Sequence, residues 1–116
     1  MLIRIEEYQR YDGASPFRDW FDRLPAQAAA KVATYLLRIE HGNTGPIKWF
    51  SGIGEVRIDW GSGYRVYLIR DGESLIVLLG GGTKASQSKD IDRALSLRDE
   101  YKTRKKAARA RTDGKR

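Results

Sequence analysis

The sequence predicts an α+β domain, in which an antiparallel sheet carries an N-terminal helical hairpin packed on one face and is followed by a C-terminal helix. Apolar residues recur at spacings of three and four in the first third of the chain, which is typical of helices. Strand-like alternation and glycine-rich turns fill the middle. A length of 116 residues suits one modest core. We assign the domain to residues 1–101 and expect residues 102–116 to be a disordered or frayed basic tail.

The N-terminal third predicts one strand and two helices. Weak alternation over residues 2–8 indicates a short strand, and Ser15 and Pro16 supply a capping hydroxyl and a proline for the start of a helix. Pro25 opens a second helix that continues to about Glu40. Each helix carries one apolar stripe, formed by Phe17, Trp20, Phe21 and Leu24 in the first and by Val32, Tyr35, Leu36 and Ile39 in the second.

Three strands in succession are predicted after a glycine-rich loop at residues 44–54. They cover residues 55–60, 64–70 and 73–79, and the Asp-Gly step between the last two is a good hairpin signal. A final helix is expected from about Ser88 onward, entering the basic tail.

Alternation divides the strand residues between two faces. If Trp60 pairs with Tyr64, then Val56, Ile58, Val66 and Leu68 share a face that packs on the helices. A two-residue turn at Asp71-Gly72 would add Ile76 and Leu78 to the opposite face, which we expect to be uncovered. That face is either a solvated surface with ion pairs such as Asp59 with Arg65, or a phosphate-binding surface, and its polar residues are Glu55, Arg57, Asp59, Arg65 and Tyr67.

Charge and composition exclude several classes of site. The net charge is +7, but residues 98–116 contain nine basic and three acidic residues, so the body is nearly neutral. The tail is either a solvated end or a phosphate-binding arm. His41 is the sole histidine, and its place at the end of a predicted helix favours a helix cap over a catalytic role. Since cysteine is absent as well, the sequence predicts no metal site. With no apolar run long enough for a membrane span or a signal peptide, we expect a cytoplasmic protein.

One long stretch of the chain resembles a known family. The run GIGEVRIDWGSGYRVYLIRDG, followed by LIVLLGGGTKASQSKDIDRA, is similar to the HigB-like addiction-module killer proteins of the RelE/ParE superfamily. An upstream Phe-x-x-Trp-Phe-x-x-Leu pattern at residues 17–24 matches as well. The resemblance covers roughly residues 2–101, and the residues in register are Glu55, Arg57, Gly63, Tyr64, Arg65, Tyr67, Gly81, Lys84, Gln87, Asp90, Ile91 and Ala94.

The resemblance implies the toxin half of a type II toxin–antitoxin pair with a RelE-like, microbial-ribonuclease-type fold. It implies a ribosome-dependent mRNA endoribonuclease that needs no cofactor. It carries the basic catalytic positions of the family over to Arg57, Arg65 and Lys84. The implied partners are a cognate antitoxin, typically a helix-turn-helix protein encoded next to the toxin, the ribosome and mRNA. Operator DNA would be contacted only through the antitoxin, and no membrane is implied.

RNA cleavage without a metal uses the 2′-OH as nucleophile and needs a proton acceptor, charge stabilisation and a proton donor. We expect Arg65 and Lys84 to hold the scissile phosphate, with Arg57 assisting. The general base is left open between Glu55 and Lys84. Lys48, Tyr67 and Gln87 are RNA-binding candidates, although packing in the sheet is the favoured interpretation of Tyr67.

Two alternatives to the nuclease stay open. A ParE-type toxin would inhibit DNA gyrase without chemistry of its own, and an inactive homologue would only bind an antitoxin or nucleic acid. The clustered cations Arg57, Arg65 and Lys84 favour the nuclease, since inhibition of gyrase does not require a phosphate-binding cluster.

Overall fold

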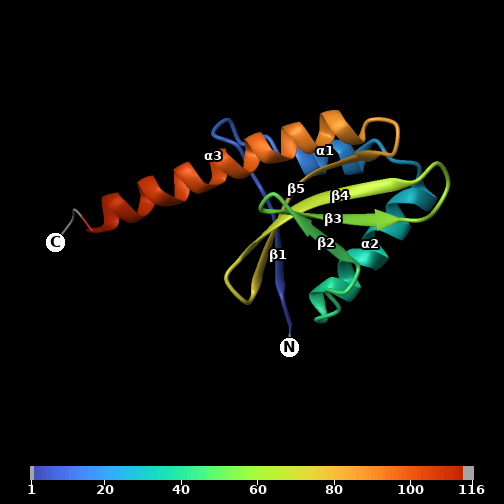
Figure 1. Cartoon of the computed structure of the whole chain (residues 1–116), viewed down its shortest axis with the longest axis horizontal. Coiled ribbons are helices and arrows are strands. Elements are labelled where there is room, and N and C mark those ends of the chain that lie inside the picture. The colour runs from blue at the N-terminus through green and yellow to red at the C-terminus, as the bar shows by residue number, and fades with distance from the viewer. Residues whose placement is uncertain (1, 114–116) are drawn as a thin grey trace.

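Five strands and three helices follow one another in the computed structural model, which describes residues 2–113 (Figure 1). The α+β class is therefore confirmed, with one strand more than the sequence predicted. The elements are β1 (Arg4–Glu7), α1 (Pro16–Asp22), α2 (Ala26–Glu40), β2 (Ile47–Phe50), β3 (Ile53–Ile58), β4 (Tyr64–Asp71), β5 (Leu75–Thr83) and α3 (Gln87–Asp113).

The sheet is mixed rather than purely antiparallel. Its strand order is β1-β5-β4-β3-β2, and β1 pairs with β5 in parallel while the other neighbours are antiparallel. The prediction of an antiparallel sheet was therefore wrong for β1. The chain leaves β1, passes through α1 and α2 and forms β2 to β4 before it returns as β5 beside β1. A long crossover of this kind is what parallel pairing requires.

The additional strand, β2, lies in the segment predicted to be a loop. It pairs with β3 across a tight turn at Ser51 and Gly52, both of which have positive φ angles, 52° and 78°. Turns with two positive φ angles match the twist of paired strands, and they usually carry Asn-Gly or Asp-Gly. Because serine, and not asparagine or aspartate, occupies the first position of this turn, the sequence did not predict the hairpin.

The helix boundaries follow the predicted capping signals. Ser15 Oγ accepts a hydrogen bond from the Arg18 backbone N–H at 3.1 Å, which caps α1 in front of Pro16. His41 is the C-cap of α2, and its Nδ1 lies 2.9 Å from the carbonyl oxygen of Leu37. The interpretation of His41 as a helix cap is confirmed.

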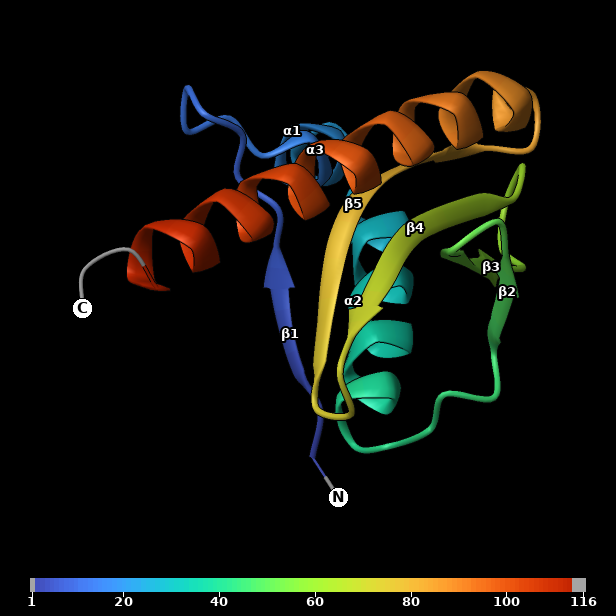
Figure 2. The ribbon, with the colours of Figure 1, turned by 60° about the vertical axis from the view of Figure 1, so that its left-hand side comes forward.

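Both faces of the sheet are covered, each by a different part of the chain. Residues of α1 and α2, among them Phe17 and Val32, pack with Val56, Val66 and Leu68 in one core. Residues of α3 pack on the opposite face in a second core, which contains Tyr8, Ile53, Tyr67, Ile69, Val77, Leu79, Ala94 and Leu97. In Figure 2, α2 lies behind the strands while α3 crosses their upper end. The second face, which we expected to be uncovered, lies in large part beneath α3. We call the two surfaces the α1/α2 face and the α3 face.

The register between β3 and β4 differs from the prediction by two residues. Ile58, not Trp60, pairs with Tyr64, so Val56 lies opposite Val66. Because side chains alternate with a period of two, a shift of two residues leaves every side chain on its predicted face. The predicted division of β3 and β4 residues between the two faces is confirmed.

The turn between β4 and β5 has the opposite effect. Asp71 pairs with Leu75, so the turn holds residues 72–74 instead of the expected two residues. Because the turn is one residue longer than expected, Ile76 and Leu78 lie on the α1/α2 face instead of the predicted opposite face. Val77 and Leu79 take the positions on the α3 face.

Residues 102–113 of the basic tail continue α3 instead of being disordered. The helix extends through Asp113, and residues 114–116 lie outside the described part of the chain. Lysine, arginine and alanine, the main residues of this segment, favour helix. The side chain of Lys105 lies 2.5 Å from Asp71 of the sheet, which anchors the middle of the segment. Within residues 2–113, no helix combines the length and the apolarity that a membrane crossing would need.

Candidate functional site

Strands β3 and β4 place two arginines side by side on the α3 face. Arg57 lies opposite Arg65, and Glu55 lies opposite Tyr67. On its other side, Arg65 pairs with Gly82 of β5. The structure therefore brings Arg57 and Arg65 together on one face of the sheet, as the alternation predicted.

Glu55 is the centre of this group. Its Oε2 accepts hydrogen bonds from Tyr67 Oη at 3.1 Å and from Gln87 Nε2 at 2.9 Å. Arg65 Nε lies 3.6 Å from the same oxygen, and Arg57 Nε lies 3.6 Å from Oε1. A carboxylate that is only 1% exposed needs such partners, because burying an unpaired charge is costly. We call Glu55, Arg57, Arg65, Tyr67 and Gln87 the Glu55 cluster.

Arg65 is buried with an unused hydrogen-bond donor. Its side chain is 8% exposed, and 3.6 Å from Glu55 is an ion-pair distance rather than a hydrogen bond. Among residues 2–113, Arg65 Nε is the one buried side-chain nitrogen or oxygen that lacks a hydrogen-bond partner. An unsatisfied buried donor costs about 1–3 kcal/mol. The fold therefore holds a guanidinium in place without using all of its donors.

Tyr67 lies inside the α3 face. The residue is 1% exposed, so its ring has no free surface on which a base could stack. Burial, followed by the nearby charge of Glu55, raises the pKa of the Tyr67 phenol well above its usual value. Tyr67 thus stays protonated and donates to Glu55, in agreement with the packing interpretation.

Gln87 links the cluster to α3. It is the first residue of that helix, and its side-chain amide donates to Glu55. The sequence predicted Gln87 as an RNA-binding residue, but this contact could not be anticipated because it depends on how α3 docks on the sheet. The bond fixes the start of α3 over the cluster.

Three of the predicted cations are exposed to solvent. The side chain of Arg57 is 61% exposed, and Lys48 and Lys84 are also exposed. Lys48 lies opposite Glu55 on β2. Lys84 follows β5 and lies beside Gly63 of the β3–β4 turn, since a Cβ built on that glycine would be 4.0 Å from Lys84 Cβ. Asp59, in contrast, lies in the exposed segment after β3, and the acidic partner of Arg65 is Glu55.

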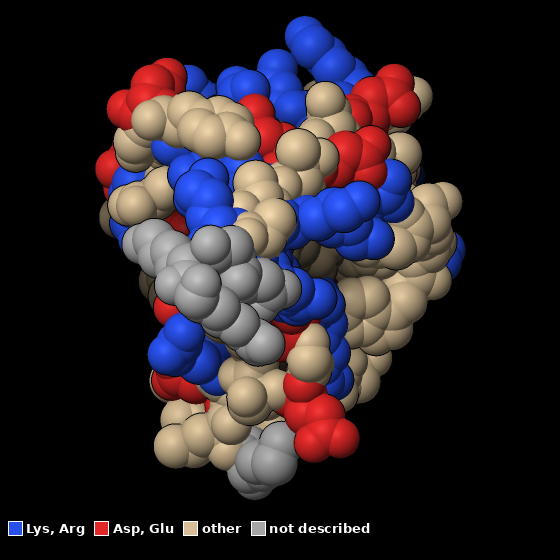
Figure 3. Space-filling model, turned by 90° about the vertical axis from the view of Figure 1, so that its left-hand side faces the viewer, with Lys and Arg blue, Asp and Glu red and all other residues tan. Residues whose placement is uncertain are grey.

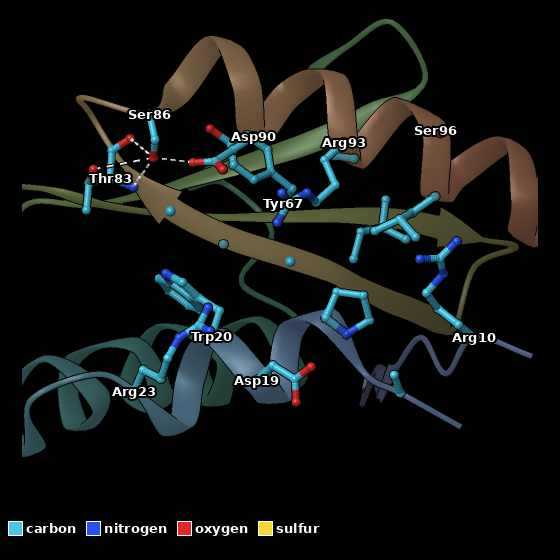
Figure 4. Close-up of a pocket in the computed structure, with 18 of the residues that line it drawn as sticks. Arg10, Asp19, Trp20, Arg23, Tyr67, Thr83, Ser86, Asp90, Arg93 and Ser96 are labelled. Atoms are coloured by element: carbon cyan, nitrogen blue, oxygen red, sulfur yellow. Dashed lines mark hydrogen bonds between the residues drawn. The ribbon is translucent and has the colours of Figure 1, made fainter. Parts of the chain in front are cut away.

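A cleft lies on the other side of α3 and was not predicted. It has a volume of about 700 Å³, with α1 as one wall, α3 as the other and the glycine run of β5 along its length (Figure 4). Trp20 of α1 and Arg23, the C-cap of α1, point into it, and Arg93 points into it from α3. The sequence signal for this cleft was the triple glycine at residues 80–82.

The C-terminal half of α3 carries most of the net positive charge. Figure 3 shows lysine and arginine side chains gathered around the end of this helix. Lys105 is paired with Asp71, and Arg104 lies over the rings of Tyr8 and Tyr11. The remaining cations of this segment are Lys102, Lys106, Arg109 and Arg111.

Comparison with known proteins identifies one relative that covers most of the fold. The chain is 44% identical over 86 residues to an uncharacterized protein of Haemophilus influenzae, a match that spans 72% of this chain and 87% of the relative. The chain belongs to the family of that Haemophilus protein. No family model matches the chain. Members of this family share enough sequence to share the fold, and the relative has no described activity from which a function could be taken.

Proposed function

We propose that this protein is the toxin of a type II toxin–antitoxin pair and cleaves mRNA on the ribosome, in the cytoplasm. The observation that carries the proposal is the pairing of Arg57 with Arg65, where Arg65 is buried with an unused donor. The resemblance of residues 2–101 to HigB-like members of the RelE/ParE superfamily supports the same function. In this proposal α1 and α2 form the helical hairpin, and the sheet is the RelE-like, microbial-ribonuclease-type core.

Arg57, Arg65 and Lys84 are the residues that we propose to hold the scissile phosphate. Arginine offers several N–H donors in a rigid plane that matches two phosphate oxygens. Arg65 is fixed by Glu55 and the surrounding core, whereas Arg57 and Lys84 reach solvent and can close on the substrate. Lys48, on the neighbouring strand β2, is our candidate for binding a further phosphate of the same RNA strand.

The reaction needs no group beyond the RNA and these side chains. The 2′-oxygen attacks the adjacent phosphorus, the bond from phosphorus to the 5′-oxygen breaks, and a 2′,3′-cyclic phosphate forms. The 2′ proton leaves to a base, and the 5′-oxygen takes up a proton. Cations around the phosphate stabilise the negative charge of the transition state, which is commonly the largest contribution to catalysis.

The structure favours a positioning role for Glu55 over that of a base. Its Oε2 already accepts two hydrogen bonds, and both oxygens lie next to arginines. A carboxylate held in this way orients Arg65, Tyr67 and Gln87. Lys84 is exposed at the rim, and we propose it as the residue that exchanges protons with the RNA.

Primer extension on a reporter message, in translating and non-translating extracts, tests the proposal. Cleavage is expected only where the message is translated. Arg57→Ala is the decisive variant because its side chain is largely exposed and its loss leaves the core intact. Removing one charge-stabilising group should lower the cleavage rate on the order of 100-fold. Arg38→Ala, an exposed arginine of α2, is the matched control and should cleave like the wild type.

A growth assay distinguishes the rival functions. Expression of the chain alone should arrest growth, and coexpression of the neighbouring gene, the proposed source of the antitoxin, should restore it. Growth arrest with intact mRNA and damaged DNA would replace the nuclease with the gyrase inhibitor. If expression causes neither growth arrest nor mRNA cleavage, both the nuclease and the gyrase inhibitor are excluded.

A further inference from the structure

The last part of the chain holds its whole net charge. Residues 102–116 contain eight basic residues and one acidic residue, whereas residues 1–101 contain equal numbers of the two. We call the described helical part of this segment, residues 102–113, the α3 arm. In Figure 1 the arm extends beyond the strands, and all residues from 102 to 112 except Arg104 are exposed. The arm is thus a strongly positive helix on a body without net charge.

Three cations of the arm lie along one side of the helix. Lys102, Lys106 and Arg109 follow one another at spacings of four and three residues, which places their side chains on one face. Lys105, in contrast, is held against the sheet by Asp71. Among the side chains of residues 2–112, none forms an ion pair with Lys102 or Lys106. These two ammonium groups are therefore available to a ligand.

The arrangement of these charges is unfavourable for an isolated helix. Lys102 and Lys106 are four residues apart, and like charges at this spacing destabilise a helix. Lys105 and Arg109 repeat the same spacing. Surface helices that are stabilised by their charges alternate acidic and basic residues instead. An anionic partner along the arm would remove the repulsion, so the charges suit binding better than they suit helix stability.

The spacing of the stripe matches a nucleic-acid backbone. From Lys102 to Arg109 the helix rises about 10 Å, and this length carries the three cations of the stripe. One strand of a duplex has one phosphate per roughly 3.4 Å of its axis, so about 10 Å of it contains about three phosphates. The cations of the stripe can therefore meet the phosphates of one strand one to one.

The arm offers little to a protein or a membrane. Residues 102–112 contain no aromatic residue and no apolar residue larger than alanine. Protein interfaces gain most of their affinity from a few anchors, commonly tryptophan, tyrosine or arginine, that fill pockets of the partner. Helices that lie on membranes insert bulky apolar side chains. A row of cations among small side chains fits a regular phosphate backbone better than either.

We propose that the α3 arm binds the phosphate backbone of double-stranded RNA beside the message, and the choice of RNA rests on the proposed function. Helix α3 connects the two surfaces. Gln87, at its start, donates to Glu55, and Lys102 lies roughly 22 Å farther along the helix axis. The arm follows residue 101, where the resemblance to the RelE/ParE superfamily ends. Its role is to hold the RNA particle on which the message lies, without touching the scissile phosphate.

Fluorescence anisotropy with the full chain and a labelled RNA hairpin tests the arm. Binding should weaken linearly with salt on logarithmic axes, because bound phosphates release counterions. Lys102→Gln combined with Lys106→Gln should weaken binding roughly tenfold at about 0.1 M salt, and the slope should become less steep by about 1 to 2. Glutamine favours helix as lysine does, so circular dichroism should show an unchanged helix content.

The matched control removes the same charge from another helix. Lys31→Gln combined with Arg38→Gln changes two exposed cations of α2 and should leave the affinity and the salt slope at their wild-type values. An equal loss in this control would mean that only overall charge matters, which overturns the proposal. Absence of RNA binding, tighter binding of a DNA duplex of the same sequence, or equal binding of a polyglutamate peptide would each overturn it as well.

A cleavage assay at varied ribosome concentration separates the arm from the proposed nuclease site. The Lys102 and Lys106 double variant should need about tenfold more ribosomes for half-maximal cleavage and should reach the wild-type maximal rate. Arg57→Ala should lower the maximal rate instead. If the wild type does not cleave, the proposed function fails, and the anisotropy measurements still decide whether the arm binds RNA. If Arg57→Ala is impaired but the double variant matches the wild type at every ribosome concentration, the arm proposal fails and the proposed function stands.

Discussion

The two faces of the sheet are made by the same strands and both are covered by helices, yet they differ in chemistry. On the α1/α2 face, β3 and β4 contribute Val56, Ile58, Val66 and Leu68, and all of them are buried and apolar. On the α3 face, the same strands contribute Glu55 and Arg65, and both are buried. The fold carries ionic groups on one face because the other supplies an uninterrupted apolar core.

This comparison separates stability from function. An apolar contact stabilises a protein in proportion to the surface it removes from water, at any orientation. A buried ion pair costs desolvation, and it stabilises only when the geometry is good. The α3 face keeps such a pair and leaves Arg65 Nε without a hydrogen bond, and both features are unfavourable for the stability of the fold. Substitutions on the two faces should therefore have different signatures.

The largest effect is expected on the α1/α2 face. Leu68 is fully buried there, and Leu68→Ala should lower the free energy of unfolding by about 2–5 kcal/mol through lost burial and the cavity left behind. Urea unfolding followed by circular dichroism measures this change. Leu37→Ala, whose side chain is 54% exposed on α2, should stay within about 0.5 kcal/mol. A loss below 1 kcal/mol for Leu68→Ala would mean that this face is not the main core.

A smaller effect on stability, but a larger one on function, is expected at Glu55. Glu55→Gln keeps the size of the side chain and an acceptor for Tyr67 but removes the charge that faces Arg65. The cost should be about 1–3 kcal/mol, measured by the same urea titration. Because Arg65 loses its fixed position, the proposed RNA cleavage should fall as well.

A double-mutant cycle tells a positioning role from simple packing. Replacing Arg65 by Met in the Glu55→Gln background removes both charges, so it should cost less than the sum of the single changes. Combining Glu55→Gln with Leu68→Ala, on opposite faces, should be additive within about 0.5 kcal/mol. Additive behaviour of the Glu55 and Arg65 variants would show that the pair is not coupled and would contradict the cluster described above.

Part of this architecture was predictable from local sequence. The face occupied by Arg57 and Arg65 followed from alternation alone, and it survived an error of two residues in the register because the period of a strand is two. The prediction of the face for Ile76 was wrong, since the β4–β5 turn is longer than expected by an odd number of residues. Capping residues such as Ser15 act within one turn, so their effect was also predictable.

The rest depends on contacts between distant segments. Gln87 meets Glu55 across 32 positions of sequence, and no local pattern encodes that contact. The cleft exists because α1 and α3 dock on opposite sides of the glycine run, and the continuation of α3 depends in part on Asp71 of β4. The charged residues of the tail favour helix individually, but their anchoring to the sheet could be seen only in the structure.

The smallest effect is expected at Asp71, where the outer half of α3 meets the sheet. Hydrogen bonds from Lys105 and from Tyr101 lower the pKa of Asp71 below its ordinary value of 3.8. Burial and the same carboxylate raise the pKa of Tyr101 to about 12, so the phenol remains a donor at neutral pH. Asp71→Asn should therefore cost about 0.5–1 kcal/mol at neutral pH, because contacts of this kind near the surface are weak.

The sign of its pH dependence follows from linkage. A carboxyl whose pKa is lower in the folded state stabilises the protein above its unfolded pKa, and that contribution disappears as the pH falls through the folded pKa. The difference in unfolding free energy between wild type and Asp71→Asn should thus be constant above about pH 5 and shrink toward zero below about pH 4. Urea titrations at several pH values measure it. A difference that grows in acid would mean that Lys105 and Tyr101 do not hold the ionised carboxylate, and that α3 leaves the sheet before residue 101.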